Sequence, residues 1–262
     1  MKDYRNYIFD LYGTLVDISV DEADRRLWEH MSLFYGYYGA RYEPEELHRA
    51  YLASVSGKDL QSREEYVVKY GYEGHPEIVY DEVFRDLYTG RGIVPDQSLV
   101  FHTTQMFRAC SVKYVRLYAH AKELLTALKE AGKKVYLLSN AQRTFTEYEM
   151  RYLGIYDLFD GVQISSDHGC KKPDERFFRI LLERFGLKPE ESLMIGNSRY
   201  DDIAGAAGVG MDSFYIQSAL SPESRKSVER AEGSEIRADH VLWKMNLRLL
   251  QSRLLEERDR CE

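Results

Sequence analysis

Four polar positions in the sequence carry side chains that together could support group transfer. Asp10 offers a carboxylate, which can act as a covalent nucleophile in phosphoryl transfer. Ser139 offers a hydroxyl, Lys172 an ammonium group and Asp202 a second carboxylate. A phosphoryl group in transfer spreads negative charge over its oxygens, so positioned donors and cations supply most of its stabilisation. These residue types therefore favour phosphoryl chemistry, provided that the fold brings them together.

A parallel β-sheet would bring them together. Each polar group follows a short apolar run, and amphipathic segments with helical periodicity separate the runs. Strands alternating with helices predict an α/β fold with a mostly parallel sheet and helices on both faces. Ligands of such sheets bind outside the carboxyl ends of the strands. The predicted strands are YIF (7–9), VYLL (135–138), GVQI (161–164), SLMI (192–195), SFYI (213–216) and HVLW (240–243).

A helical block interrupts this alternation between residues 18 and 112. Its periodicity is 3.6 throughout, and we find no convincing strand in it. We therefore expect an inserted all-helical domain at 18–112 and a core made of 1–17 and 113–262. The predicted helices lie within 19–42, 43–55, 75–90 and 96–110.

The composition limits the class of protein and its partners. The chain has 262 residues and a net charge of −7, with no long basic tract, so nucleic acid is not expected as a partner. No signal peptide or membrane-spanning stretch is recognised. Cys110, Cys170 and Cys261 form neither a disulfide framework nor a metal motif, which favours the cytoplasm. We expect a monomer or homodimer that acts on a small-molecule substrate.

Four motifs, in their order along the chain, resemble those of the haloacid dehalogenase-like (HAD) hydrolase superfamily. They are FDLYGTLVD, LLSNAQ, SSDHGCKKPDERFF and IGNSRYDDIAGAAGVGM. The resemblance covers residues 1–17 and about 113–243, and it implies a Rossmann-like three-layer sandwich with 18–112 as a mobile cap. It also implies Asp10 as the nucleophile, Ser139 as the phosphate-binding hydroxyl and Lys172 as the charge-stabilising lysine. Most members are Mg²⁺-dependent phosphatases that work through an aspartyl-phosphate, and a minority are dehalogenases.

Two residues depart from the family's phosphatase pattern. Tyr12 stands where most phosphatases of the family carry the general acid–base Asp, whose help is worth roughly 10²- to 10⁴-fold. Asn197 stands where an acidic metal ligand is usual, so weak Mg²⁺ binding is expected. The metal ligands predicted here are Asp10, the carbonyl of Tyr12, Asn197 and Asp202. One of Asp201 and Asp202 is expected to cap the following helix.

Substrate binding is assigned to Tyr12, Thr14, Asn140 and Arg41. Arg41 is included because dehalogenases of the family receive halide or carboxylate on an arginine early in the cap, and Arg25 and Arg26 compete for that role.

Three hypotheses about function follow. The first, which we favour, is a Mg²⁺-dependent phosphatase of small molecules. The second is a metal-independent 2-haloacid dehalogenase in which Asp10 forms an ester, because Tyr12 is what the family's dehalogenases carry. The third is a non-catalytic phosphate-binding protein that retains the fold.

Overall fold

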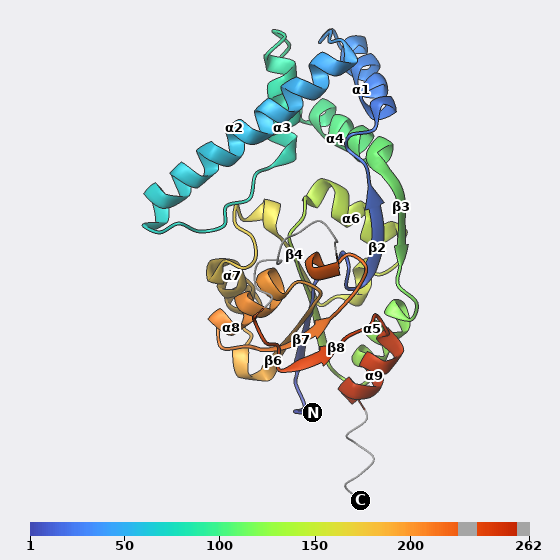
Figure 1. Cartoon of the computed structure of the whole chain (residues 1–262), viewed down its shortest axis with the longest axis vertical. Helices are drawn as coiled ribbons and strands as arrows, with labels where there is room; N and C mark the ends of the chain where they lie inside the picture. The colour runs from blue at the N-terminus through green and yellow to red at the C-terminus, as the bar shows by residue number, and fades with distance from the viewer. Residues whose placement is uncertain (225–234, 256–262) are drawn as a thin grey trace, which may run out of the picture.

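A six-stranded parallel sheet forms the centre of the molecule (Figure 1). The computed structural model describes residues 1–224 and 235–255. All six predicted strands are present, in the order β5-β4-β1-β6-β7-β8, so the α/β prediction is confirmed. The strands are β1 (Asn6–Phe9), β4 (Lys134–Ser139), β5 (Gly161–Ile164), β6 (Ser192–Gly196), β7 (Asp212–Ile216) and β8 (His240–Leu242).

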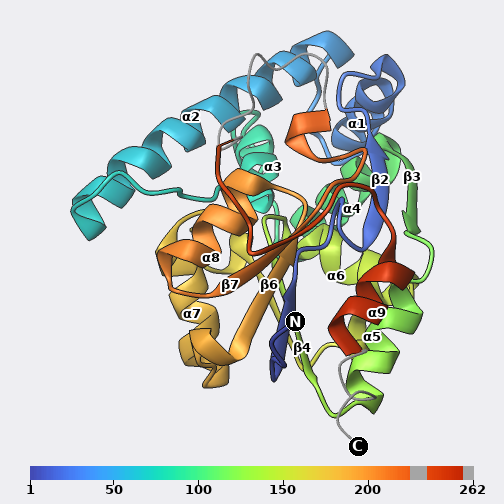
Figure 2. The same cartoon turned by 60° about the horizontal axis from the view of Figure 1, so that its bottom comes forward.

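Helices cover both faces of this sheet, which gives the Rossmann-like three-layer sandwich (Figure 2). The alternation of side chains along β1 explains why both faces are apolar: Tyr7 and Phe9 enter one core cluster, and Ile8 enters the other. The first cluster also contains side chains of α5 (Ala121–Glu130), α6 (Arg143–Tyr152) and α9 (Leu247–Leu255). The second contains side chains of α7 (Glu175–Phe185) and α8 (Gly205–Gly208).

The inserted block forms a cap above the carboxyl edge of the sheet (Figure 1). It has a hydrophobic core of its own, built around Trp28, Tyr51, Phe84 and Phe107, all of which are buried. The second predicted helix is much longer than expected and runs on to residue 70. The cap helices are α1 (Arg25–Tyr37), α2 (Pro44–Tyr70), α3 (Tyr80–Thr89) and α4 (Gln97–Ser111).

The expectation that the insert begins and ends without strands is wrong. Val16–Val20 forms β2 and Val112–Leu117 forms β3, and the two pair in antiparallel fashion. The sequence of β2, VDISV, alternates β-branched and polar residues, which is a strand period and not a helical one, whereas VKYVRL in β3 does not alternate strictly. This two-stranded stalk carries both chain crossings between the sheet and the cap.

A second connection between cap and core was predicted as helix. The expected helix at 75–90 begins only at Tyr80, and residues 71–79 form an extended strap. His75 precedes Pro76, and a residue before proline is disfavoured in the helical region. Pro76 forms an antiparallel bridge with Cys170, and the carbonyl of His75 accepts from the backbone N–H of Lys171 at 2.9 Å. The strap therefore lies against the loop that carries the catalytic lysine candidate.

None of the helices in the described ranges is long and apolar enough to cross a membrane. Cys110 and Cys170 are free thiols, and Cys261 lies outside the described residues.

Candidate active site

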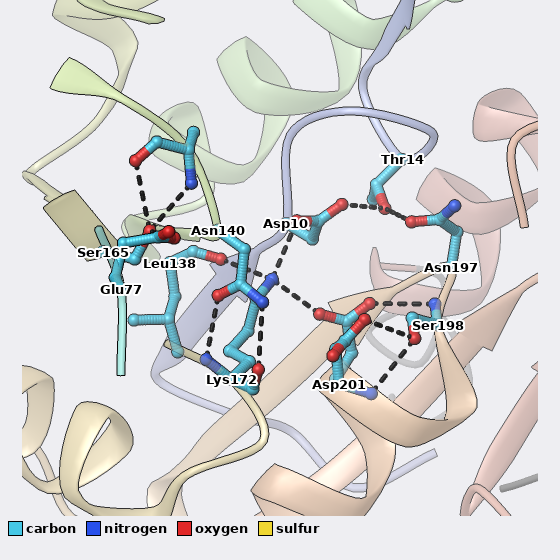
Figure 3. Close-up of polar contacts among 12 residues, drawn as sticks. Asp10, Thr14, Glu77, Leu138, Asn140, Ser165, Lys172, Asn197, Ser198 and Asp201 are labelled. Atoms are coloured by element: carbon cyan, nitrogen blue, oxygen red, sulfur yellow. Dashed lines mark hydrogen bonds and ion pairs between the residues drawn. The ribbon is translucent and has the colours of Figure 1, made fainter. Parts of the chain in front are cut away.

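A tight turn after β1 places the carboxylate of Asp10 at the edge of the sheet. The backbone N–H of Asp10 donates to the carbonyl of Ile195 at 2.9 Å, and the hydroxyl of Thr14 donates to Asp10 Oδ2 at 3.0 Å (Figure 3). Gly13 has a φ of +89°, and a Cβ at this position would lie 2.2 Å from the side chain of Asn197. The turn thus requires glycine, and it holds Asp10, Thr14 and Asn197 in contact.

Lys172 joins two carboxylates that are far apart in the sequence. Its Nζ donates to Asp10 Oδ1 at 2.8 Å, to Asp202 Oδ1 at 2.7 Å and to the carbonyl of Leu138 at 2.8 Å (Figure 3). Burial by itself would lower the pKa of Lys172, but the charges of Asp10 and Asp202 outweigh burial and raise this pKa. Lys172 therefore remains a cation and holds the nucleophile candidate in one position.

The two adjacent aspartates have different surroundings. Asp202 Oδ2 accepts from the backbone N–H of Ser198 at 2.9 Å, so both oxygens of Asp202 have donors. Asp201 Oδ2 accepts from the hydroxyl of Ser198 at 2.9 Å, and burial raises the pKa of Asp201. The predicted helix cap is wrong, because Ser198 and not an aspartate occupies the N-cap. Asp202 is the one that pairs with Lys172.

The hydroxyl of Ser139 is buried without a partner. Ser139 is the last residue of β4 and is 1% exposed, and its Oγ makes no hydrogen bond within the described part of the chain. Phe9 and Leu137 are paired in the neighbouring strands β1 and β4, so Ser139 and Asp10 follow at the same edge. Buried hydroxyls normally find a partner, and this one is available to an oxygen of a ligand.

Asn140 is engaged elsewhere. Its Oδ1 accepts from the backbone N–H of Lys172 at 2.8 Å, and its Nδ2 donates to the carbonyl of Lys172 at 3.0 Å. Asn140 thus links the end of β4 to the loop that carries Lys172. Both ends of its amide are hydrogen-bonded within the protein, so the amide is not free to bind a substrate as predicted.

The side chain of Tyr12 points away from the nucleophile candidate. Its hydroxyl donates to Glu149 Oε2 at 2.6 Å and lies 3.2 Å from the hydroxyl of Thr146, both on α6. Burial and the Glu149 carboxylate raise the pKa of Tyr12 far above its ordinary value. Glu149 in turn accepts from Arg108 of the cap helix α4 at 2.6 Å. The phenol therefore links the turn to α6 and the cap and is not placed for acid–base work.

Replacing Tyr12 by phenylalanine tests this assignment. We expect the free energy of unfolding to fall by about 1–3 kcal/mol, because Glu149 loses a buried donor. We also expect the pH dependence of kcat to keep its shape, because the phenol does not titrate in the accessible range. Urea unfolding and a pH–rate profile measure the two effects. A profile that loses one limb in the variant would assign the phenol a proton-transfer role after all.

The oxygens near Asn197 suit a hard cation. With its amide nitrogen toward the turn, Asn197 donates to Asp10 Oδ2 at 3.2 Å and to the carbonyl of Tyr12 and the hydroxyl of Thr14 at 3.3 Å each. Three oxygens thus surround the amide nitrogen of Asn197. Among the described residues no three His, Cys, Asp or Glu side chains gather as metal ligands. Yet Mg²⁺ commonly uses one or two carboxylates plus other oxygens, and Asp10, Tyr12 O and a rotated Asn197 amide fit that donor set.

The predicted cap arginines do not join this group. Arg41 is exposed and belongs to the link between α1 and α2. This link lies at the end of the cap away from the sheet (Figure 1). Arg25 forms an ion pair with Glu29 on the surface of α1, and Arg26 is exposed. Two other charged residues near the site are not predicted by the sequence. They are Arg108 on α4 and Glu77 in the strap. The His75-Pro76 pair was the available signal for the strap, whereas nothing local marked Arg108.

Known proteins resemble this chain in sequence and in fold. A family model of the haloacid dehalogenase-like hydrolases matches residues 4–210. A glyceraldehyde 3-phosphate phosphatase of Methanothermobacter thermautotrophicus is 34% identical over 116 residues, which is 44% of this chain and 51% of that protein. The match thus spans about half the length of this relative.

Two solved structures share the fold. A HAD phosphatase from Thermococcus onnurineus has a TM-score of 0.59 and 20% identity, covering 98% of this chain and all 100% of that one. An L-2-haloacid dehalogenase has a TM-score of 0.58 and 20% identity, covering 96% of this chain and 98% of that one. At such low identity the two structures show a common fold alone.

Proposed function

Since the chain belongs to the haloacid dehalogenase-like hydrolase family, we propose that it hydrolyses phosphate monoesters of small molecules through an aspartyl-phosphate on Asp10. The observation that carries the proposal is the buried, unpartnered hydroxyl of Ser139 at the same sheet edge as Asp10. A phosphoryl oxygen would satisfy it. The similarity to a glyceraldehyde 3-phosphate phosphatase supports the same reaction.

The reaction has two steps. In the first, a carboxylate oxygen of Asp10 attacks phosphorus, the bond from phosphorus to the ester oxygen breaks, and the leaving alkoxide takes a proton from water. In the second, water attacks the phosphorus of the aspartyl-phosphate, which releases inorganic phosphate and restores Asp10. Lys172 and Thr14 orient the carboxylate through their hydrogen bonds at 2.8 and 3.0 Å. Ser139 donates to an equatorial oxygen of the phosphoryl group.

Proton transfer lacks a positioned side chain at residue 12. The phenol of Tyr12 is engaged by Glu149, so solvent supplies and removes the protons. We therefore expect turnover roughly 10²- to 10⁴-fold below that of an enzyme with a general acid at this position.

Mg²⁺ is the cofactor that this proposal includes. Asp10, the carbonyl of Tyr12, Asn197 and Asp202 would hold it, with Asp202 using the second lone pairs of oxygens that already accept from Lys172 and Ser198. When bound, the ion offsets the repulsion between the carboxylate and the anionic ester.

Phosphate release from a broad panel of phosphoesters tests the function. We expect release that requires Mg²⁺ and stops with a chelator. Asn197→Asp should lower the Mg²⁺ concentration needed for half-maximal activity, because a carboxylate binds a hard cation better than an amide does. Asn246→Asp is a matched control, since Asn246 is exposed and its Oδ1 accepts from the backbone N–H of Leu249 at the start of α9, outside the proposed site. Equal rates with Mg²⁺ and with chelator would remove the metal from the proposal.

Ser139→Ala separates binding chemistry from folding. The free energy of unfolding should change by less than about 1 kcal/mol, because the deleted hydroxyl makes no hydrogen bond in the described structure. Phosphate release should fall by roughly 10²- to 10³-fold, the usual effect of losing one transition-state donor. Activity equal to that of the unchanged protein would show that Ser139 does not contact the phosphoryl group.

Halide displacement is a second candidate, and the orientation of Tyr12 favours it. A halide leaves without needing a proton, so a site with no general acid suits it. In this reaction Asp10 would form a carbon ester, which water then cleaves. Halide release from short 2-haloacids in the presence of chelator measures it. If the protein releases neither phosphate from phosphoesters nor halide from 2-haloacids, the third hypothesis, a phosphate-binding protein, becomes the favoured one.

A further inference from the structure

A cavity of about 340 Å³ lies between the cap and the core beside the proposed reaction site. We call it the cap–core cavity. On the core side it is lined by Tyr12 and Asn140, which stand two residues after Asp10 and one after Ser139. On the cap side it is lined by Glu22, Glu77 and Arg108. Its volume suits a small molecule, and its position suits the part of a substrate that leaves with the ester oxygen.

The arginine that lines the cap–core cavity is already neutralised. Arg108 Nε donates to Glu149 Oε1 at 2.6 Å, and its Nη2 donates to Glu149 Oε2 at 3.3 Å. Both side chains are largely buried, with 15% and 6% exposed. A paired guanidinium and carboxylate add no net charge to the wall. A carboxylate or second phosphate on a substrate would have to compete with Glu149 for Arg108.

Glu77 brings a negative charge that is only weakly compensated. Its side chain is 11% exposed, and its Oε2 accepts from the hydroxyl of Ser165 at 2.7 Å (Figure 3). Within the described part of the chain its ion-pair partner is Lys171, whose Nζ lies 3.9 Å from Glu77 Oε1, beyond hydrogen-bond range. Burial raises the pKa of Glu77, which means that the ionised form lacks full compensation in the protein alone.

Glu22 adds a second carboxylate to the same wall. Its Oε2 accepts from the hydroxyl of Tyr51 at 3.0 Å. Across the described ranges, Glu22 makes no ion pair with a lysine, arginine or histidine. Arg108 is paired with Glu149, and Lys171 lies 3.9 Å from Glu77, so the carboxylate of Glu22 leaves the described charges around this cavity with an excess of negative charge.

Aromatic rings complete the wall. Tyr80 from the start of α3 and Phe145 from α6 line the cavity together with Tyr12. The guanidinium of Arg108 already lies over the faces of Phe145 and Tyr12, 5.0 and 5.9 Å from the ring centroids. The attraction of a ligand cation to an aromatic face therefore falls to Tyr80, where a desolvated contact is worth up to about 2 kcal/mol. Carboxylates beside aromatic rings form an environment that suits an ammonium group better than an anion or an apolar chain.

We propose that the cap–core cavity selects phosphate monoesters whose alcohol portion carries an ammonium group, with Glu77 and Glu22 as the residues that determine specificity. This inference rests on the proposed phosphatase function. The phosphoryl group would lie at Asp10 and Ser139, and the ammonium group would lie between the two glutamates and Tyr80. An ester whose alcohol portion carries a carboxylate is rejected, because it meets two like charges and an arginine that is already engaged.

Three esters with two carbons each test this selection: phosphoethanolamine, ethyl phosphate and phosphoglycolate. They differ in carrying an ammonium group, no charge or a carboxylate. We expect kcat/KM to be highest for phosphoethanolamine and at least about tenfold higher than for phosphoglycolate, the effect of about one charge-assisted hydrogen bond. Glu77→Gln and Glu22→Gln should each reduce the ratio of phosphoethanolamine to ethyl phosphate by about tenfold. Glu64→Gln, on the exposed surface of α2, is the matched control and should leave the ratio unchanged.

Two results would overturn the proposal: a preference for phosphoglycolate, or a ratio that neither glutamine variant changes. Loss of all phosphate release is a different result, because it rejects the phosphatase function. In that case calorimetric binding of phosphoethanolamine and phosphoglycolate still decides about the cavity. Tighter binding of phosphoethanolamine, weakened by Glu77→Gln, supports the selection, whereas tighter binding of phosphoglycolate or no binding of either rejects it.

Discussion

Asp10→Asn is expected to lower phosphate release by roughly 10⁴-fold or more, because among the described residues no other carboxylate is placed to form the covalent intermediate. The side chain of Asp202 is 1% exposed, compared with 11% for Asp10, so an incoming phosphoryl group meets Asp10 first. The amide of the variant keeps the shape of the side chain. Its one oxygen can still accept from Lys172, and the hydroxyl of Thr14 can turn to accept from the amide nitrogen. Continuous phosphate release with and without Mg²⁺ measures the loss.

The control for this variant is Asp17→Asn in the same motif. Asp17 forms an ion pair with Arg116 across the stalk, at 2.7 Å, and lies outside the proposed site. The change removes one partly exposed ion pair, worth about 1 kcal/mol or less. We expect Asp17→Asn to retain activity and both variants to unfold cooperatively. Activity that persists in Asp10→Asn would reject a covalent mechanism on this residue.

Lys172→Met is expected to lower the free energy of unfolding by about 3–5 kcal/mol near pH 8, because it leaves two buried carboxylates without their cation. Lys172 is 2% exposed and donates to Asp10 and Asp202. Activity should fall as well, since the nucleophile loses its orienting donor. The size of the stability effect distinguishes this lysine from the surface lysines of the chain.

The pH dependence of this effect follows from the carboxylates. Burial raises the pKa of Asp202 even beside Lys172, and the loss of the cation raises it further. A carboxyl group whose pKa is higher in the folded than in the unfolded state destabilises the protein above that folded pKa. The penalty disappears as the pH falls toward the unfolded value. The difference in the free energy of unfolding between Lys172→Met and the unchanged protein should therefore become smaller as the pH falls from about 8 to about 5.

Urea unfolding at both ends of this pH range measures the change. Lys134→Met is the matched control, because Lys134 pairs with Asp160 at 3.0 Å on the surface and is 60% exposed. Its effect should stay below about 1 kcal/mol at both pH values. If the stability of Lys172→Met relative to the unchanged protein falls as the pH is lowered, the result contradicts the view that Asp10 and Asp202 lose their compensating cation in this variant.

The six strands and their order along the chain could be predicted because their signal is local. Each strand is a short apolar run, and each is followed by a polar residue that a parallel sheet must deliver to one edge. Asp10, Ser139 and Lys172 were placed in one site on this basis, and the structure brings Asp10 and Lys172 to 2.8 Å. The stalk and the strap differ from the prediction, because a helical period does not hold over the alternating residues of β2 or over the residues around Pro76.

The sequence by itself determined which chemical groups reach the edge of the sheet, since strand ends and residue types are properties of the local chain. Only the tertiary structure decided where the side chains at that edge point. Tyr12 turns to Glu149, 137 residues away, and Glu77 reaches Ser165 across 88 residues. Such pairings depend on which buried donors and acceptors meet after packing. No periodicity records them, because a buried polar group takes whichever partner the assembled core provides.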